Sequence, residues 1–284
     1  MKNIEIKLTN NKIINCEIKQ LEYILGMTAL MTSNEVDKNV KAINPITKEK
    51  VKIIKGNVNK IICPAHDEQD YKMAKKEGLE IRQVIAPYFG GEGKQKIRLD
   101  KELQKRRSVI VIVANKEKDK VLCMDGNNTN TRSFVMGGIE KGESPSEAAI
   151  REVKEETGYN DINVEFVSNY KVVRHFYADY KGVNRYAYLN IIFATLNTYR
   201  KINVDDKEKE KHLARWIDKI DVLDFINVEN NKFAFEMYLH GENAYIGDGR
   251  IVDVPNAEKY EEMTNIEARK KIEEILYQRE RWII

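Results

Sequence analysis

Hydrophobic and polar residues alternate in the first part of the chain, which is the pattern of β-strands that bury one face. The stretch MKNIEIKL (residues 1–8) alternates, TNNK (9–12) has the polar residues typical of a turn, and IINCEI (13–18) alternates again. The segment DEQDYKMAKKEGLE (67–80) has the composition of a short helix that ends at Gly78. We therefore predict a β-rich N-terminal region that contains one helix.

A second region follows the glycine-dense GGEGKQ (90–95) and a basic stretch, KIRLDKELQKRR (96–107). Its strands are predicted from runs of β-branched and aromatic residues: RRSVIVIVA (106–114), VLCM (121–124), VEFVSNYKVVRHFY (164–177) and NRYAYLNIIFATL (184–196). The charged DDKEKEK (205–211) is interpreted as a solvated loop, and TNIEARKKIEEILYQRERW (264–282) as a C-terminal helix. The order of elements predicts an α/β unit and then a terminal helix.

Composition narrows the class of protein. The 284 residues are 42% hydrophobic and 33% charged, and the formal net charge is +3. This near balance gives no whole-chain reason to expect binding to nucleic acid or to a membrane surface. The longest strongly apolar run, Val109 to Ala114, is far shorter than the ~20 residues of a membrane span. Cys16, Cys63 and Cys123 lie among aliphatic residues, so we expect free thiols in a cytoplasmic protein.

Six glutamates crowd the stretch GGIEKGESPSEAAIREVKEETGY (137–159). A helix should begin at Ser144, because Ser144 can cap it, Pro145 suits its first position, and Glu147 can complete a capping box. Gly158 is a good stop signal. Ala149, Ile150 and Val153 should face inward.

Glu152, Glu155 and Glu156 fall on an adjoining face of this helix, within an arc of about 100°. One interpretation is a solvated acidic face. The other is a cage of carboxylate oxygens, beside a Gly-Gly loop that carries Glu143, for Mg²⁺ or Mn²⁺. Arg151 is spaced to pair with neighbouring carboxylates without neutralising the group. We favour the cage, because divalent cations remove the repulsion.

The same stretch resembles the Nudix hydrolase box, G-x5-E-x7-R-E-U-x-E-E-x-G-U, in which U is a bulky apolar residue. Nine residues fill the pattern: Gly137, Glu143, Arg151, Glu152, Val153, Glu155, Glu156, Gly158 and Tyr159. The loop before Glu143 is one residue shorter than is common in the family, which leaves open how its backbone carbonyl is presented to a metal. The resemblance covers about Leu99 to His240.

The resemblance implies an α/β/α sandwich with a mixed sheet that cleaves a nucleoside diphosphate linked to another group, with Mg²⁺ or Mn²⁺ as cofactor. It further implies a role for each residue of the box. Glu152 and Glu156 would be metal ligands, Glu155 a ligand or the base, and Gly137 the carbonyl ligand. Glu143 and Arg151 would support and orient these groups. An additional base could come from Glu208 or Glu210, although a charged loop is the more usual explanation of both.

PAHDEQDYKMAKKEGLEIRQVI (64–85) resembles instead the editing domain of leucyl-tRNA synthetases. Two further stretches resemble that domain: KAINPITKEKVKI (41–53) upstream, and AYIGDGRIVDVPNAEKYEEMTNIEARKKIEEIL (244–276) downstream. The resemblance implies that Asp70, and with it His66, lies at a substrate site where Asp70 holds an amino group. His66 and Asp67 could equally form a turn cap. The catalytic threonines of the family are missing, so we expect a binding module and not a deacylase.

Together these resemblances predict a Nudix domain at residues 96–241 inserted into a discontinuous host domain formed by 1–95 and 242–284. The predicted function is diphosphate hydrolysis, and the alternatives are a non-catalytic nucleotide or amino-acid sensor and a trans-acting aminoacyl-tRNA editing factor. The expected partners are a nucleoside diphosphate-type small molecule and an amino acid or aminoacyl-adenosine. We expect no association with a membrane. The sequence leaves tRNA binding open and is compatible with a homo-oligomer. It does not identify the nucleotide; Tyr186 and Tyr188 could stack on a base or pack in a sheet.

Overall fold

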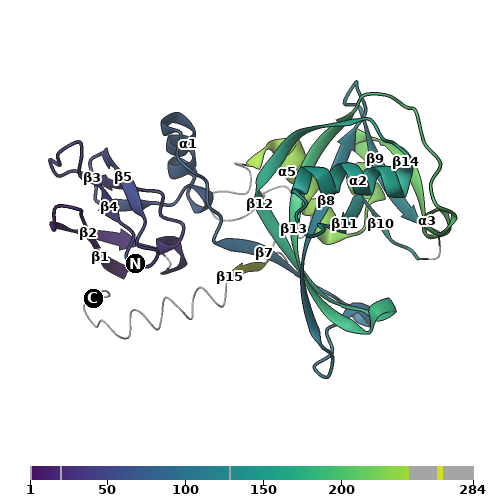
Figure 1. Cartoon of the computed structure of the whole chain (residues 1–284), viewed down its shortest axis with the longest axis horizontal. Coiled ribbons are helices and arrows are strands. Elements are labelled where there is room, and N and C mark those ends of the chain that lie inside the picture. Colours follow the sequence, from purple (N-terminus) through teal and green to yellow (C-terminus); the bar gives the residue numbers. More distant parts are fainter. Residues whose placement is uncertain (1, 20, 128, 243–260, 265–284) are drawn as a thin grey trace. The chain divides into compact units, whose positions relative to one another are not determined.

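The computed structural model describes residues 2–19, 21–127, 129–242 and 261–264. The chain forms two compact units, which within residues 2–242 divide between Ala86 and Pro87 (Figure 1). Each unit contains its own sheet. The predicted C-terminal helix and most of the segment 242–284 assigned to the host lie outside the described residues. The division into host and insert therefore stays a prediction.

The first unit is β-rich, as predicted. Its elements are β1 (Lys2–Lys7), β2 (Ile13–Ile18), η1 (Leu21–Ile24), β3 (Ala29–Thr32), β4 (Ala42–Ile43), β5 (Lys50–Lys55), β6 (Lys60–Ile62), η2 (Pro64–His66) and α1 (Glu68–Glu77). The strands form one sheet in the order β1-β2-β6-β3-β5-β4. Ile14, Cys16 and Ile18 are buried while their neighbours are exposed, so the alternation in the sequence does mark the inner face of β2.

The second unit contains a sheet of nine strands with helices beside it. Its elements are β7 (Ile85–Gly90), η3 (Gly93–Gln95), β8 (Leu103–Ala114), β9 (Lys120–Gly126), β10 (Arg132–Ser133), β11 (Val135–Gly138), α2 (Pro145–Thr157), β12 (Ile162–Ala178), η4 (Asp179–Lys181), β13 (Val183–Leu196), α3 (Asp206–Lys211), β14 (His212–Asp218), η5 (Lys219–Asp221), α4 (Val222–Phe225), α5 (Glu229–His240) and β15 (Glu261–Thr264). The main path of the sheet is β10-β9-β8-β13-β12-β7-β15, with β11 paired to β8 and β14 to β9. β8 is parallel to β13, and β12 and β13 are antiparallel, so the sheet is mixed.

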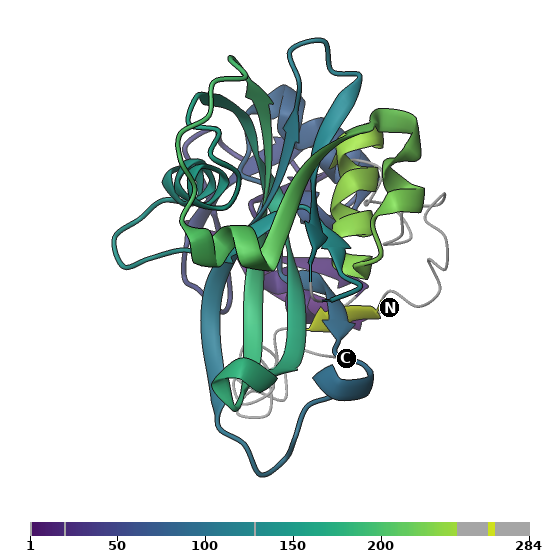
Figure 2. The ribbon, with the colours of Figure 1, turned by 90° about the vertical axis from the view of Figure 1, so that its right-hand side faces the viewer.

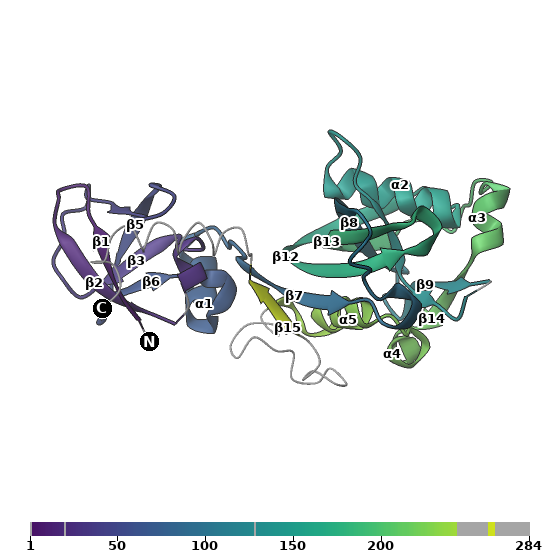
Figure 3. The same cartoon turned by 90° about the horizontal axis from the view of Figure 1, so that it is seen from below.

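Helices cover both faces of this sheet. Val109, Val111 and Val113 of β8 share a buried cluster with Ala149 and Val153 of α2. The intervening β8 residues face the other side, where α5 packs (Figure 3). All β8 residues from Ser108 to Ala114 are buried, which explains why the sequence VIVIVA is apolar without interruption. The predicted α/β/α sandwich is confirmed.

β12 and β13 form a long antiparallel hairpin with the short helix η4 at its tip (Figure 2). The hairpin extends beyond the part of the sheet that α2 covers. β8 runs beside β13 over this extension, from the pair of Leu103 with Asn184 onward. The basic end of the predicted boundary stretch is therefore part of a strand.

Two local predictions were wrong. The segment interpreted as a solvated loop contains α3, which is stabilised by oppositely charged side chains three residues apart, Lys209 with Asp206 and Lys211 with Glu208. Ile150 does not face the core; it is 39% exposed, whereas Ala148 is fully buried. The inward face of α2 is centred on Ala148, Ala149 and Val153, about one residue from the predicted centre.

None of the helices in the described part of the chain has the length and apolar character needed to cross a lipid bilayer.

Candidate active site

Helix α2 carries the clustered carboxylates, and its ends are fixed as the sequence predicts. The Ser144 side chain accepts a hydrogen bond from the Glu147 backbone N–H, and the Glu147 carboxylate accepts one from the Ser144 N–H. At the other end Gly158 has a φ of 79°, in the left-handed region that favours glycine. Tyr159 occupies the last apolar position of the motif; it is buried, and its hydroxyl accepts a hydrogen bond from the Trp216 indole N–H.

The Glu152 carboxylate lies against the backbone of Gly137. A Cβ atom at residue 137 would stand 1.7 Å from the Glu152 Cδ, a distance that no real side chain could adopt. Gly137 is in β11 and Glu152 is in α2, so the absence of a side chain lets the helix place a carboxylate against the strand backbone. The backbone of Gly137 and the Glu152 carboxylate therefore lie side by side, on neighbouring elements of one site.

Arg151 binds carboxylates on three sides. Its Nε and Nη2 donate to the two oxygens of Glu143, and its Nη1 donates to Glu152 at 2.8 Å and to Glu155 at 3.2 Å. Nη2 also donates to the Gly138 carbonyl. Hydrogen bonding to Glu143 is the largest of the effects that raise the pKa of Arg151, and it lowers the pKa of Glu143. Arg151 thus orients Glu143, Glu152 and Glu155, whereas Glu147 is committed to the helix cap.

Glu156 has no such partner. It is half-buried, and the described residues supply it with no hydrogen bond and no ion pair. Desolvation, followed by the charges of Glu152 and Glu208, raises its pKa to about 8. Burial also raises the pKa of Glu152. An uncompensated half-buried carboxylate beside other carboxylates is a place where a cation would be stabilised.

The donor chemistry fits a hard divalent cation. Glu152, Glu155 and Glu156 present carboxylate oxygens, and Gly137 adds a carbonyl oxygen, which are the ligand types that Mg²⁺ and Mn²⁺ prefer. Within the described residues, however, no three His, Cys, Asp or Glu side chains converge closely enough to hold a metal ion as they stand. Arg151, with its contacts to two of these glutamates, supplies the positive charge in this arrangement.

Of the two residues considered as an additional base, the structure brings Glu208 to the site. Glu208 belongs to α3, and its charge contributes to the raised pKa of Glu156. Its carboxylate forms an ion pair with Lys211. Glu210 lies in the same short helix, where its backbone carbonyl accepts a hydrogen bond from Asn127.

Sequence reasoning missed one arginine beside this site, Arg106, and two more on neighbouring strands, Arg174 and Arg185. The guanidinium of Arg106 lies over Gly138; a Cβ atom there would be 1.9 Å from Arg106 Nη2. The arginines come from β8, β12 and β13, and no motif links them. The signal in the sequence was an arginine within segments predicted to be strands of a packed sheet, because a charged residue is seldom buried without a partner.

In the first unit, Asp70 is buried and both of its oxygens are engaged. Lys60 Nζ lies 2.6 Å from Oδ1, and the Cys63 N–H donates to Oδ2 at 3.0 Å. Burial raises the pKa of Asp70, opposed by Lys60 and by the Cys63 hydrogen bond. An ammonium group is thus already bound where the editing-domain resemblance expects one, and this chain supplies it from β6.

His66 and Asp67 have structural contacts. Asp67 is the N-cap of α1 and accepts hydrogen bonds from the Gln69 and Asp70 N–H groups, as in the turn-cap alternative. His66 stacks on Tyr23 and accepts a hydrogen bond from the Val84 N–H. Burial lowers the pKa of His66 to about 4, so the ring is neutral near pH 7.

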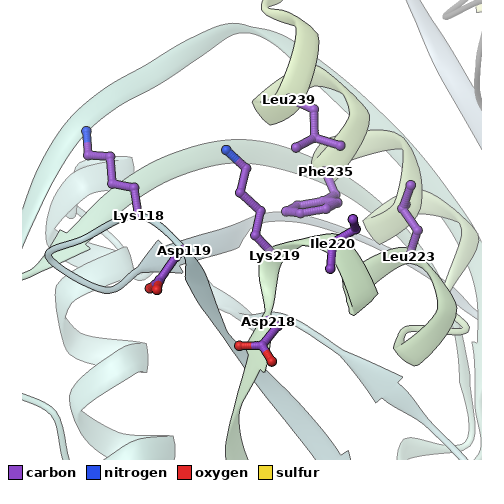
Figure 4. A pocket seen from close by; sticks show the side chains of 8 residues that line it. All are labelled: Lys118, Asp119, Asp218, Lys219, Ile220, Leu223, Phe235 and Leu239. Carbon is purple, nitrogen blue, oxygen red and sulfur yellow. The ribbon is translucent and has the colours of Figure 1, made fainter.

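A pocket of about 710 Å³ lies elsewhere on the second unit (Figure 4). Apolar side chains from η5, α4 and α5 line one part of it, and the charged residues around Lys118 and Asp218 line the other. The α2 carboxylates do not line it. We therefore place the candidate chemistry at α2 and not in this pocket.

Comparison with known proteins identifies both parts of the chain. Residues 104–237 match the family model described as "NUDIX domain", and residues 11–117 match the one described as "Leucyl-tRNA synthetase, editing domain". The two ranges overlap at 104–117, which the structure places in β8 and the turn after it, within the second sheet.

Several curated relatives are leucine–tRNA ligases, and each matches less than a third of the chain. Leucine–tRNA ligase from Saccharophagus degradans is 36% identical over 91 residues, 29% of this chain and 11% of that protein. The ligase from Borrelia turicatae is 39% identical over 99 residues, 30% of this chain and 12% of that protein. The match thus spans about a tenth of the length of these relatives.

Similar solved structures match about half of the chain. An E. coli dihydroneopterin triphosphate pyrophosphohydrolase covers 49% of this chain and 97% of its own, with 18% identity and a TM-score of 0.37. A C. elegans Ap4A hydrolase covers 48% and 99%, with 16% identity and a TM-score of 0.34. These similarities concern the fold alone.

The chain therefore contains a Nudix domain at residues 104–237, preceded by a region related to the editing domain of leucyl-tRNA synthetases.

Proposed function

We propose that the protein is a metal-dependent pyrophosphohydrolase that cleaves a nucleoside diphosphate linked to another group. The Nudix domain and the placement of its motif residues around α2 support this proposal. The observation that carries it is the environment of Glu156. A half-buried carboxylate without a partner, next to Glu152 and Glu208, is destabilising unless a cation joins it.

The residues of the site would divide the work as follows. A bound Mg²⁺ or Mn²⁺ would lower the pKa of water and offset charge on the diphosphate. Glu152 and Glu156 would hold the ion with the Gly137 carbonyl. Glu155, the most exposed of the three carboxylates bound to Arg151, would accept a proton from the attacking water. Glu143 would keep the Arg151 guanidinium in position through its bidentate contact.

The test uses Glu152→Gln and Glu156→Gln, assayed on a panel of nucleoside diphosphate derivatives with Mg²⁺ or Mn²⁺. Each amide removes a charge but keeps the size of the side chain, so kcat should fall by about 100-fold or more while the fold is kept. Glu140→Gln is the matched control, because Glu140 is an exposed glutamate of the same stretch. Near-wild-type turnover in both site variants would exclude the assignment.

The alternative functions predict other results. A non-catalytic sensor would bind a nucleotide without turnover under every metal condition. A trans-acting editing factor would release the amino acid from an aminoacyl-tRNA, and Glu156→Gln would not change that rate. We propose that the N-terminal region recognises a ligand at most weakly, because Asp70 retains a buried, ammonium-binding carboxylate from which an amino-acid ligand would have to displace Lys60.

A further inference from the structure

Arg106, Arg174 and Arg185 share one face of the second sheet. The register pairs Ala187 of β13 with Arg106 of β8 on one side and with Arg174 of β12 on the other. Paired residues of adjacent strands point to the same face, and so does Arg185, two residues before Ala187. Two arginines therefore flank an alanine, with a third beside it.

No carboxylate forms an ion pair with these three arginines in the part of the chain that the structure describes. Arg174 donates to the Gln95 side-chain carbonyl and lies over the Phe176 ring. Arg185 Nη1 donates to the Tyr180 hydroxyl, while its Nε is buried without an acceptor. Arg106 interacts with its charged neighbours only at longer range. Burial and, to a smaller extent, the charge of Arg185 lower the pKa of Arg106.

This arrangement differs from that of three arginines of the same unit that are paired with carboxylates. Arg151, Arg98 and Arg215 each have a carboxylate within 4.0 Å. Arg106 and Arg185 repel each other, and Arg185 has an unfilled donor, so these half-buried guanidinium groups are costly in isolation. An anion with several acceptor oxygens would relieve both the repulsion and the missing acceptor.

The cluster borders the candidate active site. Arg106 lies over the backbone of Gly138, whose carbonyl accepts a hydrogen bond from Arg151. The charge of Arg106 also acts on Glu152. Gly137 faces Glu152 and Gly138 faces Arg106 on the opposite side of β11, so a ligand held at the carboxylates of α2 would reach the arginines around the end of this strand, where Gly138 has no side chain.

We propose that Arg106, Arg174 and Arg185 bind a phosphate group of the substrate that is separate from the diphosphate being cleaved. The inference rests on the proposed hydrolase function and narrows its substrate class to nucleotides with at least one additional phosphate. Guanidinium groups match phosphate oxygens in geometry and charge. An uncharged sugar or alcohol would not compensate the positive charge of the cluster. The additional group could belong to a longer polyphosphate chain or to a phosphorylated ribose.

Binding can be measured without catalysis. Calorimetric titration of the metal-free protein with inorganic tripolyphosphate should give a Kd that rises at least 10-fold in Arg106→Gln and in Arg185→Gln. Arg215→Gln, which removes an arginine already paired with Asp125, should leave the Kd within 2-fold. No binding to the wild-type chain, or equal loss in the control variant, would overturn the proposal.

Two further measurements distinguish a ligand site from a structural role. The melting temperature of metal-free Arg106→Gln and Arg185→Gln should stay level or rise, because an unpaired charge is removed; a drop in both variants would overturn the proposal. On paired substrates that differ by one phosphate, the variants should raise KM about 10-fold only for the more phosphorylated one. A nucleoside triphosphate against its diphosphate tests the longer chain, and a ribose-phosphorylated dinucleotide against its parent tests the ribose phosphate. Loss of turnover in Glu156→Gln with intact tripolyphosphate binding would separate the two proposals.

Discussion

The environment of Glu156 couples proton binding to the stability of the fold through one side chain. Its pKa is raised from 4.5 to about 8, so the folded protein keeps a proton that the unfolded chain releases over this range. Stability from this group is complete below pH 4.5 and is lost as pH rises toward 8. A metal ion would need the ionised form, so its affinity should increase over the same interval.

We therefore predict that Glu156→Gln removes a pH-dependent part of the stability of the metal-free protein. Urea unfolding should show the variant more stable than the wild type at pH 8, by on the order of 1 kcal/mol, because half-exposure weakens the effect. At pH 4 the two proteins should be nearly equal. A difference that is constant with pH would contradict the assigned origin of the shift.

The buried pair of Lys60 and Asp70 determines what the N-terminal region can bind. Lys60 is held 2.6 Å from Asp70, so an amino-acid ligand would have to displace the ammonium group of this chain. The sequence resemblance predicts the carboxylate but not its occupant, because Lys60 lies in a stretch where that resemblance is lost.

Lys60→Met should free Asp70 and create a weak site for an amino acid, with a Kd in the millimolar range. Calorimetry with leucine and with its deaminated analogue isovalerate is the measurement; only leucine should bind. Lys72→Met, on the exposed face of α1, is the control. If wild-type protein binds leucine as well as Lys60→Met does, the lysine does not occupy the site.

Among the elements, α2 was predicted most completely, because its start, its stop and its carboxylates are all encoded within one short stretch. Ser144, Pro145 and Gly158 act locally, through contacts with residues only a few positions away. α3 was missed for the opposite reason. Its short run of charged residues has no apolar stripe, and its stabilising ion pairs are visible only once the segment is known to be helical.

Gly158→Ala should destabilise the second unit by about 2–3 kcal/mol. The substitution forces a side chain into the left-handed region and brings its Cβ within 2.6 Å of the Ile202 carbonyl oxygen. Urea unfolding, monitored by the fluorescence of Trp216 in this unit, would detect the loss of stability. Lys154→Ala, on the exposed face of α2, should change stability by less than about 0.5 kcal/mol. Similar values for the two variants would contradict this account of the helix end.

At the scale of the whole molecule, the two units have separate cores. The first core is built from residues between Ile4 and Ile61, and the second joins α2 to β8, β9 and β13. The sequence indicates two regions because each carries its own motif. It does not reveal the arginine cluster, because strands β8, β12 and β13 come together only through the register of the folded sheet.

Replacing residues 96–241 with a short Gly/Ser linker should leave a folded N-terminal module, since its core does not use those residues. A dispersed amide NMR spectrum is the expected result, with resonances for the β1–β6 sheet. The intact chain provides the reference spectrum. A collapsed spectrum would show that the module depends on the replaced segment.

The two adjacent glycines of β11 are constrained for unlike reasons, and this has a consequence for how related sequences should vary. Gly137 gives room to a carboxylate on one face, while Gly138 gives room to Arg106 on the other. A lineage that no longer used the arginine could accept a side chain at 138 but not at 137. We expect alanine or serine at position 138 to occur together with loss of arginine at position 106. The residues at positions 106 and 138 would then indicate which relatives share the same substrate.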